Sequence, residues 1–345
     1  MVAWPDFRVR LTRFVIIGLG MALVLAITLL LSAFSEGFEL RSERLLEAFG
    51  GDRYLIADGS AGPMTSTTPL PGELVDLIEA QGLGALPMFL TPNAVSVNGA
   101  PAGVVVAGAT GDEPGIEIVE GRWIEQPDEA VIDAELVELS LGDGFVVAGR
   151  SFTVVGVTEG VTWDIATAGL LISRDVALDV FAKRANVVTA IAIEGDGPID
   201  DLPVGTVVVG RDVAFEDVLS RTADAKRSID SFKMTLWVLA VVIVAAVLYL
   251  AAIDRVRDFA VFKATGASNT DLVLGLSLQA VFVGLMSGVF AIALAHLMMP
   301  VYPGLLSLPF SIAWTVVPVA VVIAVLSSLF GVRKAISADP SQAFG

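Results

Sequence analysis

The chain has 345 residues, 55% of them hydrophobic, and a mean hydropathy of +0.77. This hydrophobic fraction exceeds that of ordinary soluble domains, so much of the chain is expected to lie in a membrane. The formal net charge is −17, and residues 36–230 hold 33 acidic but only 12 basic side chains, which argues against nucleic acid as a partner. Cysteine is absent, which excludes disulfides, thiolate metal sites and cysteine catalysis.

The first predicted element is a membrane span at residues 14–33, an uncharged run long enough to cross roughly 30 Å of hydrocarbon. The basic residues 1–13 precede it and favour a cytoplasmic N-terminus. A cleaved signal peptide is the competing interpretation, but its apolar core is usually about 7 to 15 residues long, and no Ala-x-Ala site follows here. Residues 34–49 keep helical spacing, which predicts that the span continues outward as a stalk helix.

Residues 50–214 change to a strand-like pattern and are predicted to form a mixed α+β extracytoplasmic domain. Turn signals such as Asn98-Gly99 and Gly142-Asp143-Gly144 separate short β-branched runs. Strands are expected at residues 94–97, 104–107, 115–119, 145–148, 152–157, 187–193 and 204–209, and helices at residues 71–79 and 128–139. Long loops cross membranes largely regardless of charge, so the acidity of this segment is compatible with export.

Helical spacing returns over residues 215–253, which contain no proline or glycine. They predict a second stalk helix at 215–233 that continues into a span at 234–253. Residues 272–331 carry no charged side chain and are predicted to form spans at 272–299 and 314–331, because prolines in an outer turn at 300–313 interrupt them. Arg333 and Lys334 mark the tail, residues 332–345, as cytoplasmic.

The predicted fold class is therefore an integral membrane α-helical protein with four transmembrane helices, two of them extended as stalks. The mixed α+β extracytoplasmic domain is inserted between the first and second of these helices.

Residues 254–271 form a cationic segment between the second and third spans, and their spacing predicts an amphipathic helix on the cytoplasmic side. Such a helix suits a groove on a partner protein. The alternative is that the arginines only set the topology and the aromatic rings lie in the membrane interface. The candidate docking residues are Arg255, Arg257, Phe259, Phe262, Lys263 and the helix-ending Gly266.

No Gly-x-x-x-x-Gly-Lys-[Ser/Thr] motif occurs, so the chain is not expected to hydrolyse ATP or to act as an enzyme by itself. The single histidine and the lack of a Gly-x-Ser-x-Gly motif argue against a hydrolytic triad. We assign no catalytic residue and no metal site.

A candidate substrate site lies near the predicted outer ends of the first and third spans. Histidine, methionine and tyrosine can ligate haem iron, and arginines can pair with its propionates. The alternative is that the histidine reaches interfacial water while the methionines only pack. The candidate residues are Glu36, Phe38, Arg41, His296, Met298 and Tyr302.

Gly284 and Gly288 form a Gly-x-x-x-Gly pair in the third predicted span, a spacing that allows two helices to approach closely. The partner helix could belong to the same subunit or to a second copy.

The segment from Arg255 to Ser268, RVRDFAVFKATGAS, resembles the loop between the second and third spans of FtsX-like, or MacB-type (type VII), ABC transporter permeases. Gly121-Arg122-Trp123 followed by EAVIDAELVELSLGDGF and FTVVGV is similar to the same family, as are the C-terminal Arg333-Lys334-Ala335 and Pro340-Ser341-Gln342-Ala343. The exit of the first span, LSAFSEGF, is similar to the haem-exporter (Hrt) and Dev-type branch, although Phe38 stands where leucine is usual.

The resemblance implies a homodimeric permease in the cell membrane, bound to two copies of a separate ABC ATPase. Its substrate would be haem or another amphipathic drug or lipid, extruded from the outer leaflet, with ATP and Mg²⁺ bound only on the ATPase. Two alternatives are a lipoprotein-releasing permease and a protein that transmits the ATPase state mechanically to an extracellular cell-wall hydrolase.

Overall fold

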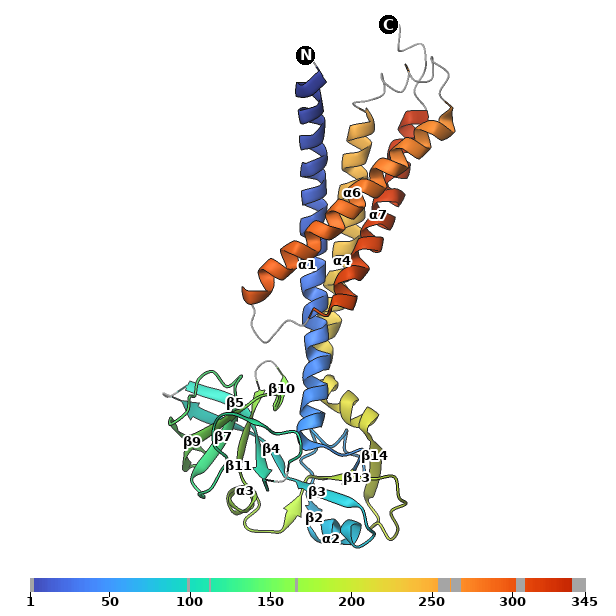
Figure 1. Cartoon of the computed structure of the whole chain (residues 1–345). Helices are drawn as coiled ribbons and strands as arrows, with labels where there is room; N and C mark the ends of the chain where they lie inside the picture. The colour runs from blue at the N-terminus through green and yellow to red at the C-terminus, as the bar shows by residue number, and fades with distance from the viewer. Residues whose placement is uncertain are drawn as a thin grey trace. The chain divides into compact units, whose positions relative to one another are not determined.

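The computed structural model describes residues 3–97, 100–111, 113–164, 167–253, 261, 268–301 and 308–336. The chain divides into two compact units, one formed by Met1–Gly37 with Ala225–Gly345 and the other by Phe38–Asp224. Two long helices, α1 (Ala3–Phe49) and α4 (Arg211–Ile253), contribute residues to both units (Figure 1).

The first unit is a bundle of helices. Besides parts of α1 and α4, it contains α6 (Asn269–Met298), the 3₁₀ turn η1 (Met299–Val301) and α7 (Phe310–Ile336). Among the described residues, three helical stretches are long and apolar enough to cross a membrane: Gly18–Phe49, Val273–Val301 and Phe310–Ser328. The predicted span at residues 234–253 lies within α4, and its membrane crossing stays a prediction.

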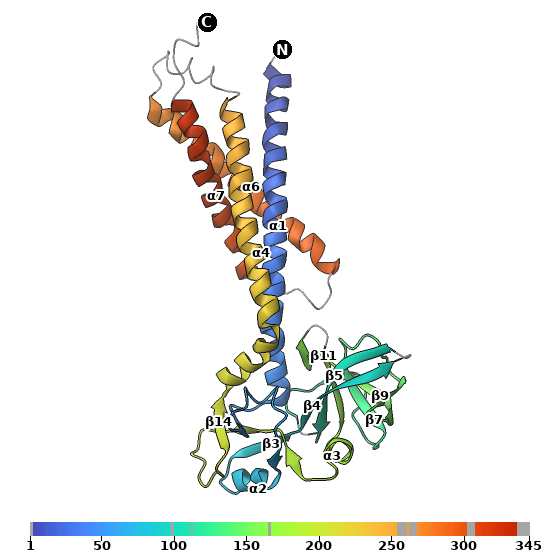
Figure 2. The same ribbon diagram turned by 180° about the vertical axis from the view of Figure 1, so that it is seen from behind.

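Small side chains fill the centre of this bundle, including Ala26 of α1, Ala240 of α4, Ala291 of α6 and Ala320 of α7. Small residues let helix backbones approach closely, as is usual in membrane bundles. Helix α6 crosses α1, and its C-terminal end then diverges from α1 in both views (Figures 1 and 2).

The second unit contains a four-stranded antiparallel sheet with the order β14-β1-β13-β3. Its strands are β1 (Arg53–Ala57), β3 (Gly84–Met88), β13 (Ala190–Glu194) and β14 (Thr206–Gly210). Helix α2 (Glu73–Glu79) packs Leu74 and Ile78 into the same cluster as Leu55 and Ile191 of this sheet. The short strands β2 (Leu70–Pro71) and β12 (Val187–Val188) pair beside it.

The other sheet of this unit closes on itself. Strand β7 pairs with both β11 and β9, which completes a ring in the order β11-β5-β4-β8-β9-β7 that we call the barrel. Its strands are β4 (Leu90–Val97), β5 (Ala100–Ala109), β7 (Glu129–Asp133), β8 (Gly144–Val147), β9 (Arg150–Thr158) and β11 (Thr167–Ser173). Strands β6 (Ile118–Gly121) and β10 (Thr162–Asp164) pair at its margins, and helix α3 (Arg174–Phe181) packs against it.

Alternation along the barrel strands separates two hydrophobic clusters, because successive side chains of a strand point to opposite faces. One cluster takes a residue from every strand of the ring: Val95, Val104, Ile132, Phe145, Phe152 and Leu170. The neighbouring residues Val105, Val131 and Leu171 belong to the other cluster, together with the end of α1.

The predicted helix at residues 128–139 is wrong. Glu129–Asp133 is strand β7, and all five of its residues are buried because β9 and β11 flank it on both sides. A short run buried on both faces has no alternation, so periodicity cannot distinguish it from a helix. Helix α3 was not predicted, although Val176, Val180 and Phe181 follow helical spacing.

Several helix boundaries also differ from the predicted ones. Helix α4 begins at Arg211, directly after β14, rather than at residue 215. Helix α6 begins at Asn269, and α7 begins inside the predicted outer turn and ends at Ile336, with Pro318 in its interior.

Candidate functional site

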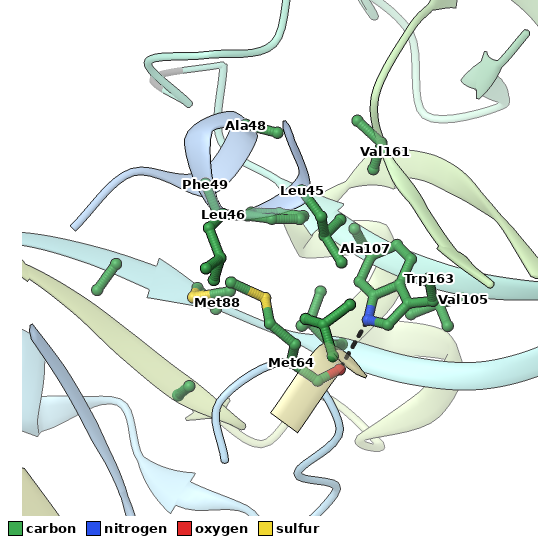
Figure 3. Packing of buried hydrophobic residues seen from close by; sticks show 14 of the residues in the cluster. Leu45, Leu46, Ala48, Phe49, Met64, Met88, Val105, Ala107, Val161 and Trp163 are labelled. Carbon is green, nitrogen blue, oxygen red and sulfur yellow. Dashed lines mark hydrogen bonds between the residues drawn. The ribbon is translucent and has the colours of Figure 1, made fainter. Parts of the chain in front are cut away.

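The last turns of α1 are buried in the second unit. Leu45, Leu46 and Phe49 point toward Met64, Met88 and Trp163 (Figure 3). The indole Nε1 of Trp163 donates a hydrogen bond of 2.8 Å to the carbonyl of Met64. Since Leu45, Leu46 and Trp163 are each at most 2% exposed, moving this part of α1 would disturb the hydrophobic cluster that they share.

Two glycines end α1 at a defined place. Gly50 and Gly51 have φ angles of +66° and +88°, which L side chains rarely adopt. The amide of Gly50 donates to Leu46 O at 3.0 Å, and the Tyr54 hydroxyl donates to Gly50 O at 2.6 Å. Burial raises the pKa of Tyr54 to about 12, so this hydroxyl remains a donor at neutral pH.

The start of α4 is tied to a loop that follows β1. Asp217, only 3% exposed, accepts hydrogen bonds from the amides of Met64 at 2.8 Å and Thr65 at 3.0 Å, and also from the Thr65 hydroxyl. Gly62 approaches Asp217 so closely that a Cβ at this position would overlap the carboxylate side chain. One carboxylate thus fixes the loop to α4.

Loops of the barrel also contact α1. Arg41 Nη2 donates to Glu135 Oε1 at 2.7 Å, and the backbone amide of Glu135 is held by Asp133 Oδ1 at 2.9 Å. Burial raises the pKa of Glu135, while the positive charge of Arg41 opposes that shift. The amide of Gly115 also donates to Ala48 O at 3.3 Å.

We call this assembly the helix junction. It consists of the Phe38–Phe49 part of α1, the Arg211–Asp224 part of α4, and the loops that Asp217 and Glu135 hold. The C-terminal end of α1 and the N-terminal end of α4 therefore share one core.

In the first unit, two buried serines join the helices. Ser287 of α6 donates to Gly18 O of α1 at 3.0 Å, and Ser327 of α7 donates to Val241 O of α4 at 3.3 Å. Such hydrogen bonds between helices replace contacts with water that a membrane cannot supply.

The glycine pair lies against α7 of the same chain. A Cβ on Gly284 would lie 2.7 Å from Val321 Cα, and one on Gly288 would lie 2.9 Å from Val317 Cα. Both glycines therefore permit the close approach of α6 and α7, whereas a contact between two copies stays a prediction.

The candidate docking residues lie outside the described residues: Arg255, Arg257, Phe259, Phe262, Lys263 and Gly266. Their role stays a prediction.

The candidate haem residues that the structure describes belong to two units: Glu36, His296 and Met298 to the first, Phe38 and Arg41 to the second. His296 is exposed and its Nδ1 lies 2.9 Å from Ile292 O, one turn earlier in α6. No hydrogen bond or ion pair joins His296 to Glu36 among the described residues, and the end of α6 diverges from α1 (Figures 1 and 2). Met298 is exposed, Tyr302 lies outside the described residues, and Arg41 pairs with Glu135.

The remaining haem candidate, Phe38, belongs to the second unit and is 3% exposed. In the described part of the chain, no group of three or more histidines and carboxylates is placed to hold a metal ion.

Sequence reasoning missed Asp217, Glu135 and Tyr54. Asp217 follows Glu216 in a polar stretch, and only the fold makes the first buried and the second exposed. Only Tyr54 had a sequence signal: it lies four residues after Gly50, the glycine that ends α1.

Two family models match the chain. The MacB-like periplasmic core domain matches residues 14–201, and the FtsX-like permease C-terminal region matches residues 232–340.

Similar proteins span the full length of the chain. Two ABC transporter permeases of Mycobacterium tuberculosis, Rv2563 and Rv0072, are 32% and 30% identical to it over 346 and 347 residues, and each alignment covers 99% of this chain and 98% of that protein. A Staphylococcus epidermidis protein named as the hemin transport system permease HrtB is 19% identical over 359 residues, covering 100% of this chain and 99% of that protein.

Among solved structures, the periplasmic region of MacB from Actinobacillus actinomycetemcomitans matches 50% of this chain and 95% of its own, with 13% identity and a TM-score of 0.35.

Proposed function

Because the chain belongs to the ABC transporter permease family that joins a MacB-like periplasmic core domain to an FtsX-like C-terminal region, we propose that it is the permease subunit of an exporter. A separate ABC ATPase would supply the energy, since the chain carries no nucleotide-binding motif. We further propose a homodimer of permeases with two ATPase copies, in the cell membrane, with both termini in the cytoplasm and the second unit outside.

The observation that supports this proposal most is the continuity of α1 and α4. Each is a single helix that contains an uncharged run of membrane-spanning length and has one of its two ends in the helix junction. A displacement of either helix at the cytoplasmic side would therefore act directly on the core of the outer domain. Residues 254–271 would receive the ATPase, with the cationic and aromatic side chains named above in contact with it.

Haem is our best proposal for the substrate, with another amphipathic drug or lipid as the broader class. The likeness to the protein named as a hemin transport system permease supports haem. Among the described residues no hydrogen bond or ion pair links Glu36 to His296, so we propose that haem either uses one of them or binds both in another state of the cycle.

The substrate proposal can be tested by titrating the purified permease with haem and recording its absorption spectrum. We expect His296→Ala, Glu36→Ala and Met298→Ala to change the spectrum of the complex. Unchanged spectra in all three variants would rule out these residues as haem ligands. Equal haem sensitivity of cells with and without the gene would rule out haem as the substrate.

The exporter proposal itself is tested by comparing ATP hydrolysis with transport. In proteoliposomes that contain the permease and its ATPase, Asp217→Asn should loosen the loop from α4, so that ATP hydrolysis continues while less substrate is exported per ATP. Glu216→Gln is the matched control, because Glu216 is the exposed neighbour on the same helix.

Equal transport by Asp217→Asn and the parent protein would contradict this coupling route. Cells that lack the gene and form chains with unchanged drug and haem sensitivity would instead favour control of a cell-wall hydrolase, and retention of lipoproteins in the membrane would favour lipoprotein release.

A further inference from the structure

The end of α1 touches the barrel through two kinds of contact. The apolar contacts of Leu45, Leu46 and Phe49 hold the last turns of the helix in the shared core. Hydrophobic contact is not directional, so by itself it tolerates small rotations and shifts of a helix. Arg41 lies one turn before Leu45, between that apolar cluster and the buried Phe38.

At this turn a charged hydrogen bond joins α1 to the barrel. Arg41 Nη2 and Glu135 Oε1 are 2.7 Å apart, and the side chain of Arg41 is 13% exposed. Hydrogen bonds between two charged groups are short and directional, so this bond specifies which side of α1 faces the barrel.

The barrel presents Glu135 from a fixed loop. Asp133, fully buried, accepts hydrogen bonds from the amide of Glu135 at 2.9 Å, the amide of Val161 at 2.7 Å and the Thr162 hydroxyl at 3.0 Å. Asp133 thereby joins the end of β7 to the start of β10 and holds the backbone of Glu135. The nearby positive charge of Arg44 also favours the carboxylate form of Glu135.

We infer that the ion pair between Arg41 and Glu135 positions the barrel on α1, so that the barrel follows the helix through the transport cycle. This inference rests on the proposed function, because it assumes that α1 moves when the ATPase binds ATP. Arg41 is then a positioning residue of the coupling route and not a ligand of the substrate.

The test uses the full-length permease with its ATPase in lipid nanodiscs. Since the chain has no cysteine, Glu43→Cys on α1 and Ser151→Cys on β9 provide two unique and exposed positions for spin labels. The distance between the labels is measured without nucleotide and with ATP trapped in the ATPase. We expect one narrow distance population in both states of the parent protein.

Removing either charge should let the barrel shift relative to α1, because the apolar contacts that remain are not directional. In Arg41→Gln and in Glu135→Gln, we expect a second distance population to emerge in the ATP-trapped state. Arg41→Lys, which keeps the charge, and the exchange of both residues, Arg41→Glu with Glu135→Arg, should restore the single population. Glu138→Gln is the matched control, because this carboxylate is exposed on the same loop.

A single narrow population in both neutralised variants would overturn the inference, and so would two populations in the parent protein. Failure of the proposed function has a different signature: labels on Glu43→Cys alone, one in each copy of the proposed homodimer, would give the same distance between the two α1 helices with and without ATP.

Discussion

Arg53 of β1 pairs with Gly210 of β14, so the strand that follows α1 and the strand that precedes α4 are hydrogen-bonded neighbours. Arg53 lies four residues after the end of α1, and Gly210 lies one residue before the start of α4. The backbone hydrogen bonds of this ladder join the C-terminal end of α1 to the N-terminal end of α4. A change that reaches either helix should therefore reach the other within the same domain.

The glycine pair predicts a steric limit on the helix bundle. Gly284→Ala places a methyl group 2.7 Å from Val321 Cα, closer than carbon atoms can approach, so α6 and α7 must separate. Overpacking of this kind costs about 1 to 3 kcal/mol. Thermal unfolding of the detergent-solubilised permease should show the loss.

Gly275→Ala is its control, because a Cβ at Gly275 would meet no atom within 4 Å. Equal unfolding temperatures for the two alanine variants would contradict the packing described for α6 and α7.

Asp217→Asn should destabilise the helix junction. An amide offers one oxygen in place of two, so at least one of the three donors from Met64 and Thr65 would face an NH₂ group. The expected cost is about 1.5 to 3 kcal/mol, the usual worth of hydrogen bonds to a charged group. Hydrogen exchange at the Met64 and Thr65 amides should become faster, and unchanged exchange rates would disprove the assignment.

Tyr54→Phe should loosen the end of α1 while leaving the core packing intact. The substitution removes only the hydroxyl that donates to Gly50 O, and it leaves that carbonyl without the bond. We expect a loss of about 1 to 3 kcal/mol in unfolding free energy.

The pH dependence of the Tyr54 contribution follows from its pKa. Burial raises that pKa to about 12, above the usual value near 10, so the contribution is complete below about pH 10 and falls between pH 10 and 12. A difference between parent and Tyr54→Phe that persists unchanged at pH 12 would contradict this.

Glu129 should give the second unit a stability that depends on acid pH. A hydrogen bond from Arg122 lowers the pKa of Glu129 to about 2, and the amides of Glu125 and Gln126 add to the effect. Since the folded pKa lies below the usual value near 4.3, the contribution is present above that pH and is lost as the pH falls toward 2.

The measurement is the free energy of urea unfolding of the parent minus that of Glu129→Gln, taken from pH 7 to pH 2. This difference should shrink below pH 4.3. Glu125→Gln serves as the control, because that carboxylate is exposed and 3.7 Å from Arg122. A constant difference over the whole range would show that Glu129 keeps its ordinary pKa.

The family and many of the strands could be predicted from local sequence patterns. Alternation in FTVVGV gave strand β9, and the cationic segment RVRDFAVFKATGAS led to the family that the comparisons confirm. The long apolar and polar runs also predicted that α1 is one helix through its stalk, as the structure has it.

Contacts between distant segments could not be predicted in this way. The closure of the barrel depends on the pairing of β7 with β9 and β11, and the buried run of β7 was misread as a helix. Likewise, Arg41 was predicted to contact the substrate because of its positive charge. Only the fold shows that it pairs with Glu135, which lies 94 positions further along the chain. Local periodicity carries no information about such pairs.

If the proposed coupling holds, ATP on the cytoplasmic side changes the surroundings of the Phe38–Phe49 part of α1. This change can be measured in sealed vesicles that hold the permease with Glu43→Cys, its ATPase and internal ATP, exposed to an external, membrane-impermeant maleimide. We predict that this cysteine reacts from outside and that its rate changes with ATP, but not with an ATPase that cannot bind ATP. No reaction from outside, or one rate in all conditions while ATP is hydrolysed, would contradict the account.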